Sequence, residues 1–343
     1  MRRVPAAIVG FGRMGRLYAA DPVMARHFPY AAHAQVLAEH PAFDWRAVVD
    51  PDPAARGEAL DHWGVPHAAA SCEALGAVAG DIEVAVLATA PDTRLGQLDA
   101  LPNLAAVLVE KPLGTTLAAG AAFLAECERR GIMVAVNLWR RADAGLRALA
   151  EGGLDAAIGP LAGGIALYGN GLRNNGTHIV DMIRMLAGEI AAGALAGADA
   201  GFVEGPIEGD RNPACALTLA SGATILLQPV RFADYRENGL IVWGERGRLD
   251  IMNEGLSIAT YARCDNRAMQ GEREIPADRP HWHASGAGTA LYAMYDNLAE
   301  ALASGDPGAL VSPGRSALAS ARIVEQIAAL NPERPLFTAA TAP

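Results

Sequence analysis

The start of the chain constrains the possible folds more than any other segment. A short apolar run, Val4–Val9, leads directly into a glycine pattern of the form G-x-G-x-x-G: Gly10, Phe11, Gly12, Arg13, Met14 and Gly15. Behind a buried strand, the first glycine makes a tight turn, the second lets the backbone approach a pyrophosphate, and the third lets the next helix pack closely. The segment therefore predicts a strand, a dinucleotide-binding turn and a helix; a purely structural glycine turn is the alternative.

An acidic residue closes the second predicted strand. Phe43–Val49 ends at Asp50, and an aspartate at that point can accept hydrogen bonds from the adenosine ribose hydroxyls and would repel a 2′-phosphate. Pro51 and Asp52 bring no basic residue to offset that repulsion, so NAD is favoured over NADP. The alternative is that Asp50 merely starts an Asp-Pro turn.

The spacing between these two features is longer than usual. Asp50 lies 35 residues after Gly15, whereas about 20 residues is typical of the dinucleotide fingerprint. We therefore expect an insertion around residues 19–32, where prolines and aromatic rings predict a loop or broken helix beside the cofactor's phosphates. It could cover the site or simply extend the surface.

Strand and helix patterns alternate as far as a last strand at 132–137, and past about residue 155 the rhythm changes. Further apolar strands are predicted at 84–88, 105–109 and 132–137, and strands separated by helices indicate a parallel sheet covered on both faces. Later strands are joined by short turns, which cannot make parallel crossovers, so the second sheet should be mostly antiparallel. These later strands are 161–168, 214–219, 223–228, 239–243, 248–251 and 256–261.

The chain is therefore expected to form an α/β domain over residues 1–140 and an α+β domain over residues 141–343. Two closing helices, 288–304 and 313–330, could pack back on either domain. The Ala-Gly stretch 191–201 is the nearest thing to a linker.

Composition and charge exclude several classes of protein. The formal net charge is −10 and Lys and Arg form no cluster, which argues against a nucleic-acid partner. No run approaches the roughly 18 apolar residues of a membrane span. The first three residues resemble a twin-arginine export signal, but the apolar stretch after them is shorter than a signal core. We interpret the four widely spaced cysteines as reduced thiols of a cytoplasmic protein: Cys72, Cys127, Cys215 and Cys264.

A charged tripeptide, Glu110-Lys111-Pro112, stands where the predicted strand 105–109 leaves its sheet. In open parallel sheets ligands gather outside the carboxyl ends of the strands, and a partly desolvated lysine held there can move protons. A solvated turn is the alternative. Other residues at strand ends are expected to meet the cofactor or line the pocket: Thr89, Pro91, Asn137, Trp139 and Arg140.

A second segment, residues 174–184, enters a helix from a loop rich in glycine and asparagine. Its apolar residues recur at helical spacing, while His178 falls in the first turn and Asp181 lies three residues further on. A histidine at a helix start can act as a neutral base because the helix dipole opposes its protonation. The alternative is a histidine satisfied by a cap or by Asp181.

These residues together resemble the Gfo/Idh/MocA family of nicotinamide-dependent oxidoreductases. The glycine pattern, Asp50, Glu110-Lys111-Pro112 and the segment 174–181 occur in the family's order and approximate spacing. The resemblance implies an N-terminal Rossmann domain, a C-terminal open antiparallel sheet, and a homodimer or homotetramer built on that sheet's exposed face. By position, Lys111 matches the family's active-site lysine and His178 its usual proton acceptor.

The chain departs from the family pattern at two positions. Asn174 stands four residues before His178, where many members have aspartate, and an asparagine can orient a hydroxyl but cannot share a proton. The family's usual histidine after Pro91 is also replaced, with Arg94 as the candidate for its place. Any proton relay would therefore rest on His178 and Lys111.

The resemblance predicts hydride transfer between NAD and a secondary alcohol or ketone of a sugar, sugar acid, cyclitol or nucleotide sugar. His178 would take the hydroxyl proton while Lys111 hydrogen-bonds the same oxygen, because an ordinary histidine pKa of about 6.5 suits a base better than lysine's of about 10.4. Two alternatives stay open: an elimination or hydrolysis that uses NAD transiently, and a non-catalytic NAD- or sugar-sensing regulator. A sensor would not need the retained Lys111 and His178.

Candidates for substrate binding surround the second segment: Tyr168, Arg173, Asn174 and Asn175. Arg173 or Arg140 could meet a carboxylate or phosphate, with a surface ion pair as the alternative. His281 and His283 have a spacing that resembles a metal site. No metal is expected, however, because no cluster of further ligands supports these two histidines.

Overall fold

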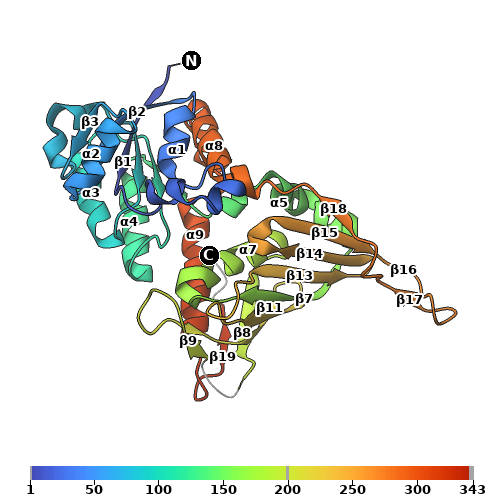
Figure 1. Ribbon diagram of the computed structural model, residues 1–343. Helices are drawn as coiled ribbons and strands as arrows, with labels where there is room; N and C mark the ends of the chain where they lie inside the picture. The colour runs from blue at the N-terminus through green and yellow to red at the C-terminus, as the bar shows by residue number, and fades with distance from the viewer. Residues whose placement is uncertain (1, 198–200, 340–343) are drawn as a thin grey trace. The chain divides into compact units, whose positions relative to one another are not determined.

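The computed structural model describes residues 2–197 and 201–339. The chain divides into two compact units, Met1–Ala142 with Gly288–Leu318 and Asp143–Ala287 with Ala319–Pro343. Each unit is built on its own main sheet (Figure 1). Of the closing helices, α8 (Ala290–Ser304) belongs to the first unit, whereas α9 (Gly314–Ala328) begins in the first unit and ends in the second.

The first unit holds a six-stranded sheet with the order β3-β2-β1-β4-β5-β6, and its strand pairs are all parallel. β1, β2 and β3 follow one another towards one edge of the sheet, and β4, β5 and β6 follow one another towards the other edge. The order along the chain therefore reverses between the neighbouring strands β1 and β4. Ligands of such sheets bind at this reversal, outside the carboxyl ends of the strands. The strands are β1 Val4–Val9, β2 Phe43–Val49, β3 His67–Ala69, β4 Val84–Leu87, β5 Ala106–Val109 and β6 Met133–Val136.

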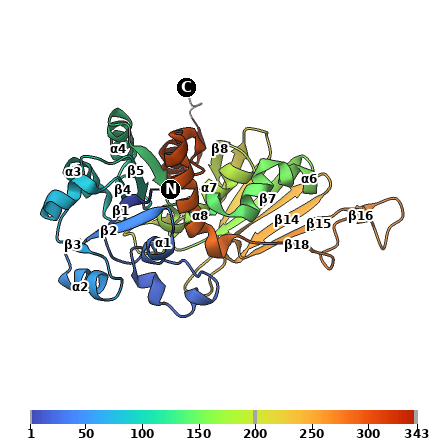
Figure 2. The same cartoon turned by 90° about the horizontal axis from the view of Figure 1, so that it is seen from above.

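Helices cover both faces of this sheet, as the apolar strands require. Phe11, Leu37 and Leu298 belong to the core under α1, α2 and α8, whereas Leu98 and Phe123 belong to the core under α3 and α4. Figure 2 shows the two layers of helices on either side of the strands. Besides α8, the helices that cover this sheet are α1 His33–Glu39, α2 Pro53–Asp61, α3 Arg94–Ala100 and α4 Leu117–Arg129.

The glycine pattern leads first into turns and short 3₁₀ helices and only later into a helix, which agrees with the loop or broken helix expected around residues 19–32. α1 begins only at His33, and the N–H groups of His33 and Ala34 donate to the carbonyls of Met14 and Gly15 at 2.9 Å each. In a continuous α-helix, residues 18 and 19 would make those bonds, so about 15 residues are inserted into the helix start. Without them about 20 residues would separate Gly15 from Asp50, which is the usual spacing of the fingerprint.

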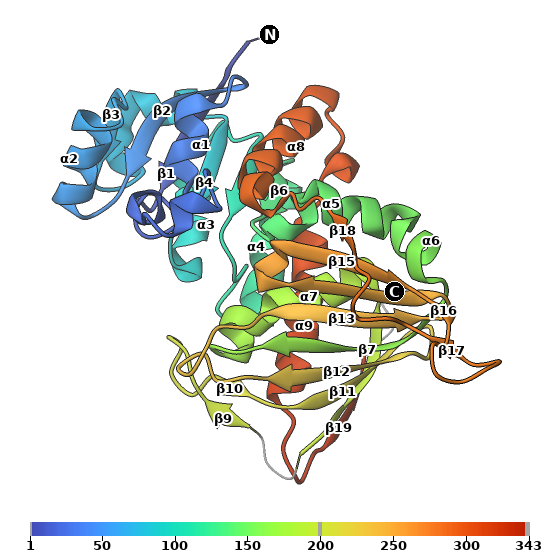
Figure 3. The same cartoon turned by 45° about the vertical axis from the view of Figure 1, so that its right-hand side comes forward.

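The second unit holds a nine-stranded sheet with the order β18-β15-β14-β13-β7-β12-β11-β8-β19 (Figure 3). Among its described pairs only β7 with β12 is parallel, which is possible because α7, β8 and β11 lie between them along the chain. The strands are β7 Leu161–Tyr168, β8 Ile190–Leu195, β11 Cys215–Leu219, β12 Thr224–Pro229, β13 Gly239–Gly244, β14 Gly247–Met252, β15 Ser257–Ala262, β18 His281–His283 and β19 Leu336–Thr338.

Four strands of the two main sheets escaped sequence-based prediction, namely β3, β8, β18 and β19, and so did the two-residue strands β9, β10, β16 and β17. β8 lies in the Ala-Gly stretch 191–201, whose small residues carry little strand propensity; residues 198–200 lie outside the described part of the chain. A small hairpin, β16 with β17, projects beyond the large sheet in Figure 3. The remaining elements are α5 Ala144–Ala148, α6 Leu154–Ile158, β9 Phe202–Val203, β10 Arg211–Asn212, β16 Cys264–Asp265 and β17 Arg273–Glu274.

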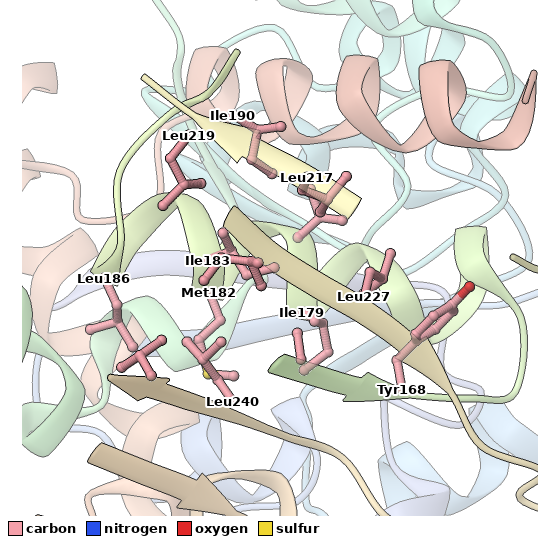
Figure 4. Packing of buried hydrophobic residues seen from close by; sticks show 14 of the residues in the cluster. Tyr168, Ile179, Met182, Ile183, Leu186, Ile190, Leu217, Leu219, Leu227 and Leu240 are labelled. Carbon is pink, nitrogen blue, oxygen red and sulfur yellow. The ribbon is translucent and has the colours of Figure 1, made fainter. Parts of the chain in front are cut away.

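One face of the nine-stranded sheet packs against α7 (Thr177–Leu186). Figure 4 shows the apolar face of this helix, with Ile179, Met182 and Ile183 directed at the strands' leucines and isoleucines. This packing confirms the helical spacing read from the sequence. It also fixes the first turn of α7, where His178 lies, on the sheet.

Within residues 2–197 and 201–339, no helix combines the length and the apolar character that crossing a membrane would take. All four cysteines are free thiols, and three of them are buried.

Candidate active site

Five of the predicted cofactor residues lie at one edge of the parallel sheet. Asp50, Gly10, Thr89, Glu110 and Asn137 follow the ends of β2, β1, β4, β5 and β6. The N–H groups of Gly10, Glu110 and Asn137 extend the ladder to the last carbonyls of neighbouring strands at 2.8, 3.0 and 2.8 Å. This is the carboxyl edge at which parallel sheets bind ligands.

The three glycines of the loop differ in their surroundings. Gly10 has a φ of 94°, and a Cβ there would lie 2.8 Å from the backbone of Ala88. A Cβ on Gly15 would lie 2.7 Å from the carbonyl oxygen of Gly10. At Gly12, by contrast, no described atom lies within 4 Å of the Cβ position. The loop therefore combines two tightly packed glycines with one open stretch of backbone, which fits the approach of a pyrophosphate.

The carboxylate of Asp50 ties the glycine loop to the second strand. Its Oδ2 accepts the Phe11 N–H at 2.6 Å and its Oδ1 accepts the Asp52 N–H at 2.8 Å. Arg56 of α2 donates to the backbone carbonyls of Asp50 and Pro51 at 2.8 Å each. This basic residue lies six positions after Asp50, beyond Pro51 and Asp52, on which the preference for NAD read from the sequence rests.

Arg94, the candidate for the place of the family's histidine, is a buried clamp on the backbone around Lys111. The residue is 1% exposed. Burial lowers the pKa of Arg94 to about 10, although the charges of Glu110 and Asp92 raise it, so the guanidinium stays charged at neutral pH. It donates at 2.7–3.3 Å to four carbonyl oxygens, those of Thr89, Glu110, Pro112 and Leu113. Its place is therefore structural, and it holds the ends of β4 and β5 together.

Two donors hold the carboxylate of Glu110, whose side chain is 12% exposed. Its Oε1 lies 2.6 Å from Asn137 Nδ2 and 2.9 Å from His33 Nε2. Burial raises the pKa of the Glu110 carboxyl, but His33, Asn137 and the charge of Lys111 together outweigh burial and lower the pKa. Glu110 is therefore ionised at neutral pH beside Lys111.

Lys111 is the only lysine among the chain's 28 lysine and arginine residues. Every other residue in this count is an arginine, so the need for a positive charge does not by itself explain a lysine at position 111. Lysine differs from arginine in that its pKa shifts readily and it can exchange a proton near neutral pH. This compositional signal was present in the sequence and is independent of any motif.

The insertion reaches the segment after β6. Phe28 packs edge-on against Trp139, with ring centroids 6.1 Å apart, and the guanidinium of Arg140 stacks on Trp139 at 4.3 Å. Arg140 is buried. The insertion thus supports two residues expected to line the pocket, and their contact with substrate stays a prediction.

In the second unit, the segment before α7 forms a π-helical turn, Leu172–Gly176, that is held by a buried aspartate. Asp210 accepts the N–H groups of Arg173 and Asn174 at 3.1 and 3.0 Å. A Cβ on Gly171 would lie 2.2 Å from Asp210 Oδ2, so only glycine lets the carboxylate approach. Turns of this kind are frequent at functional sites. Asp210 was missed because it is far away in the sequence.

The polar candidates of this turn and of α7 have different surroundings. Asn174 Nδ2 donates to the Asn170 carbonyl at 3.0 Å, whereas the buried Nδ2 of Asn175 meets no acceptor among the described residues. His178 is half-buried in the first turn of α7. Asp181 accepts a hydrogen bond from Ser320 at 2.7 Å, which ties α7 to α9.

Two predicted substrate residues of this unit are engaged in structural contacts. The hydroxyl of the fully buried Tyr168 donates to the Pro213 carbonyl at 2.8 Å. Arg173 pairs with both carboxylate oxygens of Glu325 at 2.6 and 2.8 Å, which is the ion-pair alternative considered for it. A substrate would have to displace these contacts.

His281 and His283 lie on β18 with ring centroids 4.8 Å apart, and His283 Nε2 is 2.9 Å from Thr260 Oγ1. In the described part of the chain, no group of three His, Cys, Asp or Glu side chains could hold a metal.

The sheet, the open glycine loop and the acidic strand end define the first unit as a dinucleotide-binding Rossmann domain. Residues 4–138 match the family model described as oxidoreductase family, NAD-binding Rossmann fold. This segment belongs to that family, Gfo/Idh/MocA, and the resemblance read from the sequence is confirmed. The description also supports the expectation of NAD. No curated protein sequence matches the chain.

Solved structures share the fold over the whole chain. A levoglucosan dehydrogenase in complex with NADH and levoglucosan has 18% identity and a TM-score of 0.73, covering 99% of this chain and 100% of its own. A putative myo-inositol dehydrogenase from Sinorhizobium meliloti has 20% identity and a TM-score of 0.72, covering 98% and 100%. An oxidoreductase from Agrobacterium radiobacter with NAD⁺, L-tartaric acid and magnesium has 16% identity and a TM-score of 0.71, covering 98% of each. The predicted fold class, a Rossmann domain with a mostly antiparallel second sheet, is confirmed.

Proposed function

We propose that the protein is an NAD(H)-dependent oxidoreductase that transfers hydride between the nicotinamide and a secondary alcohol or ketone of a sugar, sugar acid, cyclitol or nucleotide sugar. The observation that carries the proposal is the single lysine, Lys111, placed with Glu110 at the carboxyl edge of the sheet that also bears the glycine loop. The named ligands and substrates of the structural neighbours, levoglucosan, myo-inositol and tartaric acid, support a polyhydroxylated substrate.

The residues of the first unit fit the cofactor. The open backbone at Gly12 would hold the pyrophosphate and Asp50 would accept the ribose hydroxyls. NAD, when bound, supplies the hydride acceptor. Lys111 would then donate a hydrogen bond to the substrate oxygen and stabilise the negative charge that develops there, while His178 takes the hydroxyl proton. Asn174 would orient a hydroxyl without sharing its proton.

The proposal is tested by identifying the nucleotide that copurifies with the protein and by screening sugars, sugar acids, cyclitols and nucleotide sugars for hydride exchange. A steady rise in NADH absorbance with one of these classes supports the dehydrogenase. Turnover of a sugar derivative without net NADH would replace it with the transient use of NAD, and bound nucleotide without any turnover would favour the sensor.

The preference for NAD should depend on Asp50. In Asp50→Ala, NADP loses its repulsion and NAD loses its ribose acceptors, while Arg56 remains beside the site to attract a phosphate. We expect the ratio of kcat/KM for NAD over NADP to fall by about 10- to 100-fold, which corresponds to about 1.4–2.8 kcal/mol. Asp52→Ala, at the neighbouring turn position, is the control and should leave the ratio within about twofold. Tighter binding of NADP than of NAD by the unaltered protein would contradict the assignment of Asp50.

We also infer that the outer face of the nine-stranded sheet joins copies of the chain into a dimer or tetramer. On this face the half-exposed Leu226 stands opposite Ile165, which in turn stands opposite Ile241. In Leu226→Asp an unpaired carboxylate would be buried on assembly, and we expect the dissociation constant measured by sedimentation to rise at least about 10-fold. Leu95→Asp, at an equally exposed leucine of α3, should leave it unchanged. Wild-type protein that sediments as a monomer would refute this assembly.

A further inference from the structure

A buried row of polar side chains runs from α8 to the tripeptide of the first unit. The hydroxyl of Tyr295 lies 2.8 Å from His33 Nδ1, and His33 Nε2 lies 2.9 Å from Glu110 Oε1. Tyr295 and His33 are both fully buried. Burying polar groups is costly unless each is hydrogen-bonded, and the proposed hydride transfer uses neither of these two residues.

One hydrogen-bond direction in this row follows from its surroundings. Burial and the charge of Glu110 raise the pKa of Tyr295 well above its ordinary value, so its hydroxyl stays protonated. The ionised Glu110 carboxylate can only accept, so His33 donates its Nε2–H to Glu110. With Asn137, two donors therefore converge on the same carboxylate oxygen.

This arrangement bears on the neighbouring Lys111, whose charge helps to lower the pKa of the Glu110 carboxyl. A carboxylate released from its donors would turn towards the nearest ammonium, and a tighter ion pair would stabilise the charged lysine. A carboxylate held by His33 and Asn137 shares its charge among several partners. The lysine then gives up its proton more easily.

We infer that His33 is a positioning residue that keeps the Glu110 carboxylate turned into the buried row, and so keeps Lys111 able to exchange a proton with substrate. The inference rests on the proposed function of Lys111. His33 also donates its backbone N–H to the Met14 carbonyl of the glycine loop at 2.9 Å. One residue thus bonds both to the loop that would hold the dinucleotide and to the carboxylate beside the lysine.

Other charged or titratable groups near this row are fixed by contacts of their own. Arg94 is bound to backbone carbonyls, including that of Glu110. The ring of His40 lies 6.2 Å from that of Tyr295, and its Nε2 is 3.1 Å from Asp296 Oδ1. The experiment must therefore report on Lys111 itself.

Because Lys111 is the only lysine, reductive methylation with ¹³C-formaldehyde labels one side chain besides the terminal amine. The dimethyl resonance can be titrated by NMR, and its absence from Lys111→Arg identifies it. In His33→Leu, we expect the pKa of dimethylated Lys111 to rise by about one unit, because the released carboxylate closes on the ammonium. In Glu110→Gln, we expect it to fall by about one unit, because the charge is lost.

A second variant keeps the inference open to refutation if His33→Leu does not fold. Tyr295→Phe removes one hydroxyl and its hydrogen bond to His33 Nδ1 but keeps His33 itself, so it should give a smaller rise. A titration that stays unchanged or shifts downward in the folded variant overturns the inference. No turnover is needed for this measurement, so a failed substrate screen would refute the proposed function alone, and an unchanged titration in an active enzyme would refute the role of His33 alone.

Discussion

Replacing Lys111 with methionine is expected to lower the single-turnover rate of hydride transfer by about 100- to 10,000-fold, the usual contribution of a positioned acid or base. Methionine keeps most of the length of the side chain but removes the hydrogen bond and the charge that would oppose the developing negative oxygen. The glycine loop and Asp50 are untouched. The dissociation constant of NAD should therefore change by less than about threefold. The corresponding change in binding free energy is well below the value of about 1.4 kcal/mol that a tenfold change represents.

Three further variants show whether this loss belongs to proton chemistry. Lys111→Arg keeps a positive charge but exchanges no proton near neutral pH, so it should stay close to the methionine variant. His178→Gln should also lose activity, and the double variant should be little worse than the worse single one, because residues that act as a unit are not additive. Unchanged rates in both Lys111→Met and His178→Gln would exclude the scheme.

The sequence predicted elements best where an apolar run has clear turn residues at both ends. β1, β2 and β7 have the predicted bounds residue for residue, because turn residues follow each of them directly, Gly10 after β1, Asp50-Pro51 after β2 and Gly169-Asn170 after β7. β8 was overlooked because its alanines and glycine carry almost no strand signal; pairing with β11 and β19 determines it. The parallel pairing of β7 with β12 depends on the whole path of the chain between them.

The same division holds for the candidate site. Gly10, Asp50 and Lys111 could be proposed from the sequence because each stands directly at or after the end of a predicted strand. His33 was not, because its partners Glu110 and Tyr295 are 77 and 262 residues away. The insertion made His33 still harder to recognise, because it separates the start of α1 from the glycine pattern along the chain. In the structure, the start of α1 is nevertheless hydrogen-bonded to that pattern.

The second large effect expected is on stability. Replacing Arg94 with leucine should lower the free energy of unfolding by about 3–5 kcal/mol, because four buried backbone carbonyls lose their charged hydrogen-bond donor. Leucine restores apolar packing and removes a buried charge, but it leaves four carbonyl oxygens around the tripeptide without their common donor. Each unsatisfied group costs about 1–3 kcal/mol, and relaxation or water offsets part of that sum.

Arg130→Leu is the matched control for Arg94→Leu. Arg130 is an arginine of the same unit that also donates to a backbone carbonyl, that of Leu98. Its side chain is 25% exposed, and its ion pairs with Asp99 and Glu126 are open to solvent on one side. Such pairs contribute about 0–1 kcal/mol. Denaturant unfolding should therefore separate the two variants by at least about 2 kcal/mol. Equal losses would mean that the backbone around Lys111 holds its shape without the guanidinium. If the clamp acts as described, Arg94→Leu protein that is still folded should also lose hydride transfer, because a lysine on a loosened turn cannot hold its hydrogen bond to the substrate oxygen.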